Sequence, residues 1–566
     1  MHSSSPKMGR AERRRRARGA ARNCSNVRLP RGAACLTAIL LASCAVGPDF
    51  VEPPAPDVTR YTKEPLKPSS ASAGSGLGQG ERFVEGRDIP GQWWELFHSR
   101  ALNDLVEDSL KHNPTIDQAQ AALRVAYQNA EAQKSAFFPT MGASFTASTV
   151  RFPEQVSPPG STTSPYLRLY TPQVDVGYVP DVFGLVRREV EGLEATTAMQ
   201  QYNLEATYLT LTSNVVAAAI QEASLRGQIK ATKKIIKIEI DLLKLLKRQL
   251  ELGQVAVADV LVQEAALAAA EQLLPPLQLS LAHQRDLLTA LAGRYPSDEI
   301  AEKFTLASLT LPKELPVSLP SAVVEQRPDI KAADASLQSA SAAIGVAIAN
   351  RLPVINLTGS AYYGGTTAGL LFTHLASGWS LVGAATQPIF DGFGLYHKQK
   401  AAEAAYDQAE ATYRSTVITA FQNVADSLRS IQYDAKALKA AVHAEDAAFK
   451  SLEIVRKQAE LGQVNVLAIL TQEQLYLTAL VTRVIAEAAR FSDAAALIQA
   501  LGGGWWNRQD VAPNNDDSRS SGCREIIGPV LTPCVPVPSI AGAGVQPTGA
   551  NVQTQGATVQ RQGDRS

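Results

Sequence analysis

Two runs of sequence that lack helix breakers constrain the fold of this chain more than any other feature. Residues 185–252 contain no proline and only two glycines, Gly192 and Gly227. Residues 395–461 contain neither glycine nor proline. A run of about 67 residues forms a helix on the order of 100 Å long. Compact globular domains rarely need such helices, so the chain is predicted to be elongated and mainly helical.

The two runs belong to an internal repeat. Each begins just after a similar segment, Asp-Val-Phe-Gly at residues 181–184 and Asp-Gly-Phe-Gly at residues 391–394. Each ends at the tetrapeptide Leu-Gly-Gln-Val, which starts at Leu252 and, 209 positions later, at Leu461. Recurrence at this spacing predicts two homologous halves, which we place at residues 93–316 and 317–505.

A second helical pattern follows each Leu-Gly-Gln-Val turn, so each long helix is predicted to fold back as a hairpin. The return arm is unbroken over residues 466–501 in the second repeat, whereas Pro275 and Pro276 must kink or break it in the first. Apolar residues in the first long run recur at coiled-coil spacing, beginning with Ile235 and Ile238. The lysines between them are interpreted as a solvated helix face.

Composition excludes several classes of function. The chain has 566 residues and a formal net charge of zero, so no bulk charge favours a nucleic-acid partner. No run of 18 apolar residues predicts a spanning helix. The sequence has no histidine or cysteine cluster with metal-ligand spacing, no nucleophile elbow and no Walker motif, and its seven histidines are scattered. We therefore expect no enzyme activity, no metal and no cofactor.

The amino terminus has the pattern of an export signal, predicted to comprise residues 1–43. A basic region that includes Arg13 to Arg16, Arg18, Arg28 and Arg31 precedes an apolar run over residues 33–43. An alternative interpretation of the basic run is a nucleic-acid-binding arm. The apolar run ends in Leu-Ala-Ser-Cys, which resembles the bacterial lipoprotein box and makes Cys44 the candidate for lipidation, including palmitate; the alternative is a plain signal peptide with a chance cysteine. Several acyl chains would anchor the protein stably, whereas one would not.

Two further segments flank the repeats. Residues 44–92, rich in proline, glycine and serine, are interpreted as a lipidated extension, and their glycine-rich stretch as linker. Trp93 and Trp94 then begin the folded region. Residues 506–566 are predicted to be a disordered tail, in which Cys523 and Cys534 could close a small loop in an oxidising compartment.

Each repeat also carries shorter elements before its long helix. Prolines break two helical segments in each repeat, at residues 102–111 and 115–137 and again at residues 322–326 and 329–350. The period then changes from helical to two, which predicts four strands with one apolar and one polar face, at residues 141–150, 170–179, 354–363 and 379–390.

The predicted strands are each about ten residues long, the length that crosses a bilayer when tilted. An alternative is a half-buried sheet of a soluble protein. If the strands span a membrane, four of them cannot close a barrel, for which about eight are needed. Open edges are not tolerated in lipid, so the protein would have to oligomerise, and three copies would supply twelve strands.

These features together resemble the TolC-like outer-membrane factor family, in its OprM-like lipoprotein branch. The resemblance rests on Cys44 followed by Ala-Val-Gly-Pro-Asp-Phe, on Trp93-Trp94, on the two Leu-Gly turns and on the closing Leu-Gly-Gly-Gly-Trp at residues 501–505. It covers nearly all of residues 44–505. It implies a homotrimer with a twelve-stranded β-barrel in the outer membrane of a Gram-negative bacterium. A long α-helical barrel would continue through the periplasm.

The resemblance also implies partners and site residues. The hairpin tips would dock a periplasmic adaptor that joins an inner-membrane transporter of the RND type. Arg248 and Arg456 precede the two turns, as the arginine of the family's Arg-x-x-x-Leu-Gly pattern does; a solvated charge favoured by the helix dipole is the alternative. The residues assigned to the tips are Arg248, Leu252, Gly253, Arg456, Leu461 and Gly462.

The family's periplasmic constriction lies just past the second turn. The resemblance puts its apolar residue at Leu467 and its commonly acidic position at Thr471, where this chain departs from the family. Glu473 is the nearest carboxylate and would supply a cation-attracting ring if it faced the channel axis. Asp259 and Glu264 lie in the corresponding stretch of the first repeat.

The predicted function is therefore the exit duct of a tripartite efflux pump, exporting small molecules such as drugs or solvents. One alternative is the duct of a type I protein secretion system. Another, from a different class, is a lipid-anchored coiled-coil scaffold without a pore. Strands of bilayer length argue against the scaffold, because a scaffold does not need them.

Overall fold

The computed structural model describes residues 45–54, 56–58, 60–64, 68–72, 80–151, 153 and 166–508. The predicted export signal, Cys44, Cys523 and Cys534 lie outside the described residues. The described residues belong to one compact unit. Trp506, Asn507 and Arg508 are also part of this unit, so the fold extends beyond the predicted end of the second repeat.

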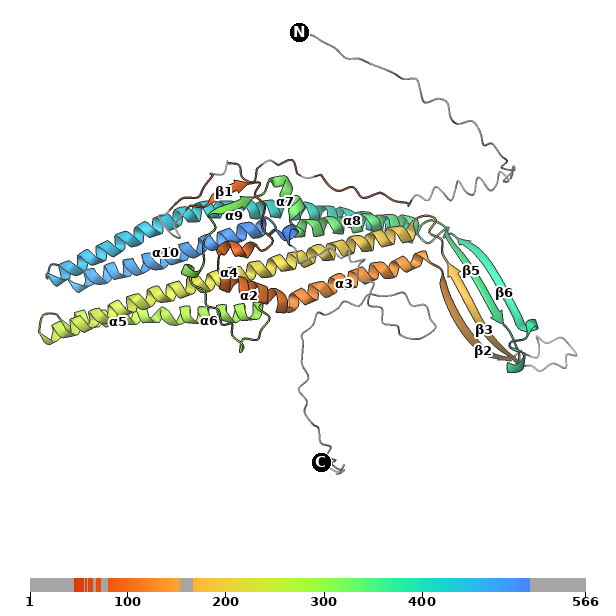
Figure 1. Ribbon diagram of the computed structural model, residues 1–566, viewed down its shortest axis with the longest axis horizontal. Helices are drawn as coiled ribbons and strands as arrows, with labels where there is room; N and C mark the ends of the chain where they lie inside the picture. Colours follow the sequence, from red (N-terminus) through yellow and green to blue (C-terminus); the bar gives the residue numbers. More distant parts are fainter. Residues whose placement is uncertain are drawn as a thin grey trace, which may run out of the picture. The chain divides into compact units, whose positions relative to one another are not determined.

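Two helices of 67 residues each are the longest elements, as predicted. They are α4 (Leu185–Glu251) and α9 (Gly394–Glu460), and each is followed by a return arm. In the second repeat the return arm is the single helix α10 (Val466–Ala500). In the first it is α5 (Val257–Gln272) followed by α6 (Leu274–Leu291), so the break occurs just before the predicted proline pair. Figure 1 shows the two hairpins side by side.

Prolines begin the shorter helices of both repeats. Pro114 starts α3 (Pro114–Lys134) and Pro328 starts α8 (Pro328–Ala349), where a missing amide hydrogen costs no helical bond. The side chain of Asn113 caps α3 by accepting a hydrogen bond from the Thr115 amide at 2.9 Å. The remaining helices are α2 (Arg100–His112), α7 (Pro320–Gln326) and the 3-10 turns η2 (Trp93–Phe97), η3 (Ser135–Phe137), η5 (Leu306–Ser308), η6 (Ala368–Leu370), η7 (His374–Ala376) and η8 (Trp505–Asn507).

Of the described helices, α8 alone is long and apolar enough to cross a membrane, judged by length and composition. It packs against both α4 and α9, and residues such as Ile330 and Leu337 are buried there.

The four predicted strands pair into one antiparallel sheet in the order β2-β3-β5-β6. The register joins the two repeats through β3 and β5, where Val176 lies opposite Gly359. The strands are slightly longer or shorter than predicted, and their bounds are β2 Thr140–Arg151, β3 Tyr166–Tyr178, β5 Val354–Tyr363 and β6 Ser377–Thr386.

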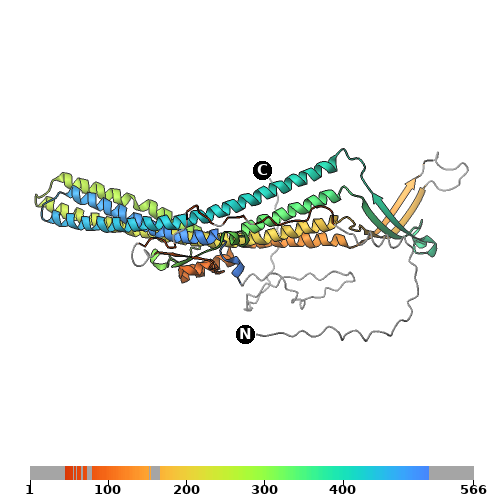
Figure 2. The same cartoon turned by 90° about the horizontal axis from the view of Figure 1, so that it is seen from above.

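Much of this sheet is uncovered in the protomer, most of all its two outer strands. Nearly every residue of β2 is exposed, and so is nearly every residue of β6. Large apolar side chains on the strands are uncovered, with Met141 77% exposed and Trp379 79% exposed. The strands extend beyond the helix ends, and none of the described helices covers either face of the sheet (Figures 1 and 2). The two hairpin turns lie at the other end of the long helices.

A second, small sheet was not predicted. Strand β1 (Arg82–Glu85) pairs in parallel with β4 (Glu314–Val317), which connects the two repeats. The extension at residues 44–92 therefore contains a strand, at residues 82–85, that the sequence pattern does not predict. Next to β1, Glu81 forms an ion pair of 2.9 Å with Arg490, and both side chains are almost fully buried.

The main core lies where the amino-terminal segments cross the middle of the long helices. Trp93 and Phe97 insert there, and their rings meet edge to face at 6.4 Å. Aromatic and aliphatic burial of this kind contributes about 1.5–3 kcal/mol per large side chain. A separate apolar cluster joins the hairpins nearer the turns, and it contains Ala231, Ile235, Leu452, Ile469, Tyr476, Leu477 and Leu480.

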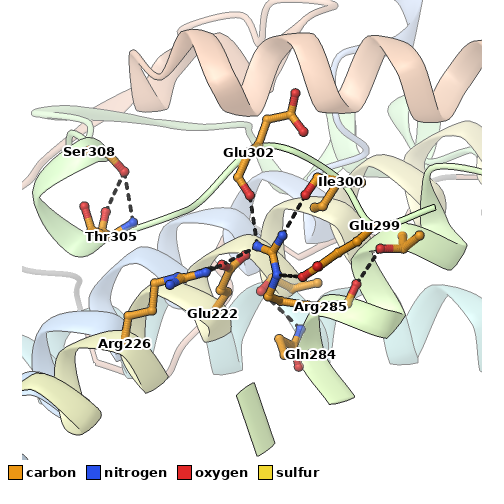
Figure 3. Close-up of polar contacts among 11 residues, drawn as sticks. Glu222, Arg226, Gln284, Arg285, Glu299, Ile300, Glu302, Thr305 and Ser308 are labelled. Atoms are coloured by element: carbon orange, nitrogen blue, oxygen red, sulfur yellow. Dashed lines mark hydrogen bonds and ion pairs between the residues drawn. The ribbon is translucent and has the colours of Figure 1, made fainter. Parts of the chain in front are cut away.

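Arg285 on α6 holds the connection between the repeats to this middle region (Figure 3). Its guanidinium donates to Glu222 on α4 at 3.0 Å and to the Ile300 carbonyl at 2.6 Å. It also bonds Glu299 and the Glu302 carbonyl. A buried arginine needs this many acceptors, because an unpaired buried charge is strongly unfavourable. These contacts join residues 299–302, which follow α6, to α4.

Candidate functional site

The two Leu-Gly turns have the same geometry. Gly253 and Gly462 adopt φ of 68° and 69°. In the first turn the Gln254 amide donates to the Gln249 carbonyl at 2.8 Å, and in the second Gln463 bonds Gln458 at the same distance. This is the Schellman arrangement, in which a left-handed glycine satisfies the last carbonyls of a helix. The predicted glycine C-caps are therefore confirmed in both repeats.

Different residues begin the return arms. The side chain of Asn465 accepts from the Ala468 amide at 3.2 Å and caps α10. In the first repeat the side chain of Asp259 caps α5, because its carboxylate accepts a hydrogen bond from the Ala256 amide at 3.1 Å. Asp259 is thus a helix-capping residue in the described protomer.

The predicted docking residues at the turns are accessible. Leu252 is 60% exposed and Leu461 is 73% exposed. A Cβ on either turn glycine would meet no atom within 4 Å. Arg248 is also exposed and pairs with Glu251 on its own helix at 3.3 Å. Two exposed leucines on two matching turns form a surface that a partner could contact at both hairpins.

Two predicted constriction residues share an exposed face of α10. Leu467 is 61% exposed, and Thr471 lies one turn further along the same face. The Thr471 hydroxyl donates to the Leu467 carbonyl at 2.9 Å, so it is satisfied within the helix. This face is free to meet other copies of the chain.

Glu473 lies on a different face of α10. The prediction that it could face the channel axis is wrong, because its side chain is buried within the protomer. It is only 1% exposed and pairs with Arg456 of α9 at 2.7 Å. Two residues after Thr471 on an α-helix, a side chain is turned by about 200° from that position. The carboxylate therefore points between the helices of the protomer.

Arg456 also differs from its predicted role. It lies five residues before Leu461, whereas Arg248 lies four before Leu252, so only Arg248 has the Arg-x-x-x-Leu-Gly spacing. In the repeat, Arg456 matches Lys247 instead, 209 positions earlier. Lys247 pairs with Glu264 at 2.8 Å in the first hairpin. Each hairpin thus has a cation–glutamate pair at this matched position, and the pair joins its two arms.

The segment that follows Cys44 is docked at the opposite end of the long helices. The Val46 amide donates to the Phe183 carbonyl at 3.1 Å, just before α4 begins. The guanidinium of Arg188, whose side chain is 4% exposed, donates to the Gly47 carbonyl and to Asp49 at 3.3 and 2.8 Å. Arg188 was not among the predicted site residues, because an arginine in a long helix usually belongs to a solvated face.

Glycines allow this close docking. A Cβ on Gly184 would lie 2.6 Å from the Ala45 Cα, and one on Gly47 would lie 2.6 Å from the Gly345 Cα. Gly47 and Gly184 also have positive φ, 101° and 80°. The segment is therefore seated against α4 and α8, and it brings residue 45 to the sheet end of the helices.

Among the described residues, no three histidine, cysteine, aspartate or glutamate side chains gather as metal ligands. The arrangement instead offers an uncovered sheet at one end, exposed turns at the other, and long helices between them.

Comparison with known proteins agrees with this arrangement. The family model described as outer membrane efflux protein matches residues 105–294 and 319–503, one match for each repeat. The chain is 26% identical to the probable efflux pump outer membrane protein TtgC of Pseudomonas putida, over 84% of this chain and 96% of that protein. It is 27% identical to the outer membrane protein OprJ of Pseudomonas aeruginosa, over 83% and 95%.

Solved structures share the fold. The outer-membrane channel OprN superposes with a TM-score of 0.72 at 24% identity, covering 82% of this chain and all of that chain. VceC of Vibrio cholerae gives a TM-score of 0.69 at 24% identity, covering 74% and 100%. The matched family is one of transport channels and not of enzymes. The chain therefore belongs to the outer membrane efflux protein family and is the outer-membrane exit duct of an efflux pump.

Proposed function

We propose that three copies of this chain close one continuous duct that serves a tripartite efflux pump. The observation that carries the proposal is the uncovered four-stranded sheet, whose outer strands β2 and β6 each have one edge that pairs with no strand among the described residues. Unpaired edges cannot remain open in lipid. Joining β6 of one copy to β2 of the next would satisfy both edges, and three copies would close a twelve-stranded β-barrel.

The exposed apolar side chains of the sheet support a lipid environment. Met141, Phe145 and Trp379 are each more than 60% exposed in the protomer. Such a patch is unusual on a soluble surface, whereas a membrane barrel presents an apolar outer face to lipid. A scaffold without a pore would leave this surface unexplained. The outer membrane of a Gram-negative bacterium is the membrane we assign.

We assign the two hairpin turns to a periplasmic adaptor protein. The exposed Leu252 and Leu461, each beside a left-handed glycine, provide two equivalent apolar contacts per copy. The adaptor would join the duct to an inner-membrane transporter of the RND type, which supplies the energy. The exposed Arg248 is a further adaptor contact, whereas Arg456 is engaged inside the protomer.

The cargo is proposed to be small molecules such as drugs or solvents. Relatives of similar length include a toluene efflux pump outer membrane protein and an antibiotic efflux pump outer membrane protein from Pseudomonas putida. Protein export through a type I secretion system is the second candidate. Export of a small dye by cells with and without the gene, compared with export of a secreted protein, distinguishes the two.

Cys44 is proposed to be lipidated. The docking of residues 45–49 beside Phe183 and Arg188 supports this, because it would hold residue 44 next to the end of the sheet, at the edge of the proposed membrane. Mass spectrometry of the mature amino terminus tests it. Acyl chains on Cys44 are expected, and Cys44→Ser should give an unprocessed or unlipidated protein. An unmodified terminus at another residue would contradict the assignment.

Leu467 is proposed to line the periplasmic constriction with Thr471. Their exposure on one face of α10, close to the second turn, supports this role. Three copies of Leu467 would seal the axis by apolar contact, and no charge from position 471 would oppose it.

Planar-bilayer recording of the purified full-length protein tests the duct itself. Discrete single-channel steps are expected, because three sheets joined into one closed barrel would surround a water-filled lumen. Insertion without any conductance, in the wild type and in Leu467→Ala alike, would favour the scaffold.

A further inference from the structure

Two buried carboxylates face each other across the seam between the hairpins. Glu239 of α4 is 5% exposed and Glu473 of α10 is 1% exposed. The two carboxyl groups lie close enough to interact directly. The surrounding seam is apolar, with Ile235 on α4 and Ile469 and Tyr476 on α10. Two ionised carboxylates in such a place would repel each other strongly.

Four helices each contribute one polar group to this cluster. Glu239 comes from α4, Gln263 from α5, Arg456 from α9 and Glu473 from α10. The Gln263 amide donates to a carboxylate oxygen of Glu239 at 2.5 Å, and Arg456 donates to Glu473 at 2.7 Å. The next charged group along the seam, Lys234, is engaged with the Tyr476 hydroxyl at 2.8 Å.

The charges and donors of the cluster do not balance. One arginine faces two carboxylates, so full ionisation leaves one buried negative charge. The second carboxylate oxygen of Glu473 is buried and has no donor among the described residues. A proton on one carboxyl group would supply that donor and remove the excess charge together.

We propose that Glu239 and Glu473 form a proton-binding site that links the two hairpins of each protomer. The proton bridges the carboxyl groups, and its loss places like charges on α4 and α10 in an apolar seam. The site lies within about three helical turns of the second Leu-Gly turn, on the same helix as Leu467. Loss of the proton therefore loosens the hairpins close to the proposed constriction.

The electrostatics agree with the geometry. Burial, followed by the charge of Glu473, raises the pKa of Glu239 to about 7, against the smaller opposing effect of Arg456. Because the two groups interact, the titration belongs to the pair. The Glu239–Glu473 pair therefore holds its proton in mildly acidic medium and loses it as the pH rises through neutrality.

The internal repeat supplies a matched control. Glu264 is the first-repeat equivalent of Glu473, and it pairs with Lys247 in the same way. Its side chain is 43% exposed, so its charge remains solvated. Glu264→Gln should therefore leave the pH response of the protein unchanged, whereas Glu239→Gln keeps a hydrogen-bonding group in the seam but removes the titration.

Thermal unfolding of the full-length protein in detergent, measured across pH 5 to 8, tests the proton site without any need for conduction. The wild type and Glu264→Gln should lose stability as the pH rises. Glu239→Gln should lose less stability over this pH range, and its difference from the wild type should develop around neutral pH. Parallel profiles for wild type and Glu239→Gln would overturn the site.

The consequence for opening rests on the proposed duct, and planar bilayers test it separately. Wild-type conductance should increase as the pH rises through neutrality, and Glu239→Gln should lose this dependence. If Glu239→Gln changes the pH dependence of unfolding but the protein never conducts, the proton site stands and the proposed duct is contradicted. Conducting channels whose pH response is the same in both proteins would overturn the role in opening.

Discussion

Arg456 and Glu473 pair at 2.7 Å across the two arms of the second hairpin, 17 positions apart in the sequence. Lys247 and Glu264 pair at 2.8 Å across the first hairpin with the same separation. The repeat has thus kept a cation–glutamate link in both hairpins. Only the second link is buried, because Glu473 faces the seam with α4 whereas Glu264 remains partly solvated.

Replacing either turn glycine by alanine should weaken the hairpin end. The left-handed backbone at Gly253 and Gly462 costs about 1–2 kcal/mol for a residue with a Cβ. No neighbouring atom would clash with the new methyl group, so the cost is one of backbone strain alone. Hydrogen exchange of the turn amides should become faster. Gly142→Ala in β2, where a Cβ also meets no atom and φ is not positive, is the matched control.

Leu467→Ala should increase single-channel conductance with little change in melting temperature. The side chain is 61% exposed in the protomer, so its removal opens little cavity within one copy. If Leu467 instead packs between helices of neighbouring copies, the substitution should cost about 2–5 kcal/mol of stability. A lower melting temperature with unchanged conductance would therefore assign Leu467 to packing. Ile485→Ala, at a half-exposed site further along α10, serves as the control.

Arg188→Met should release the segment that follows Cys44. The substitution removes charge-assisted hydrogen bonds to Asp49 and Glu191, each worth about 1.5–3 kcal/mol, together with bonds to two backbone carbonyls. Limited proteolysis should then cut near residues 45–54 faster than in the wild type. Arg187→Met, on the neighbouring position, should leave these residues protected. Equal protection in Arg188→Met would show that the glycine contacts hold the segment without the guanidinium.

A second acidic pair predicts pH-dependent stability in the middle of the protein. Burial, followed by the charge of Asp434, raises the pKa of Asp493 to about 8. The folded state therefore holds a proton that the unfolded chain releases near pH 3.8. Its stabilising contribution is complete below pH 3.8 and is lost as the pH rises to about 8. Asp493→Asn should flatten this part of the unfolding profile, and an unchanged slope would contradict the shared proton.

The helices and strands could be predicted to within a few residues because glycine and proline mark their ends. Pro114, Pro328, Gly253 and Gly462 each stand at an observed boundary. The β1–β4 pair could not be found in this way. Each strand has four residues, their partners are more than 200 positions apart, and a parallel pair this short shows no alternation.

The candidate site was only partly predictable for a physical reason. Exposed turn residues such as Leu461 follow from the local Leu-Gly signal. The burial of Glu473 does not, because its repeat equivalent Glu264 has the same residue type and the same partner charge but remains partly exposed. What differs is the neighbouring helix, and that depends on tertiary packing. The docking of Arg188 against residues 46–49 depends on packing in the same way.

The mass of the detergent-solubilised full-length protein by native mass spectrometry tests the central claim most directly. The unpaired edges of β2 and β6 can be satisfied in lipid only by neighbouring copies. The expected result is a single species with the mass of three chains, retained under conditions that keep the strands folded. A single-chain mass with the strands intact would contradict the closed duct.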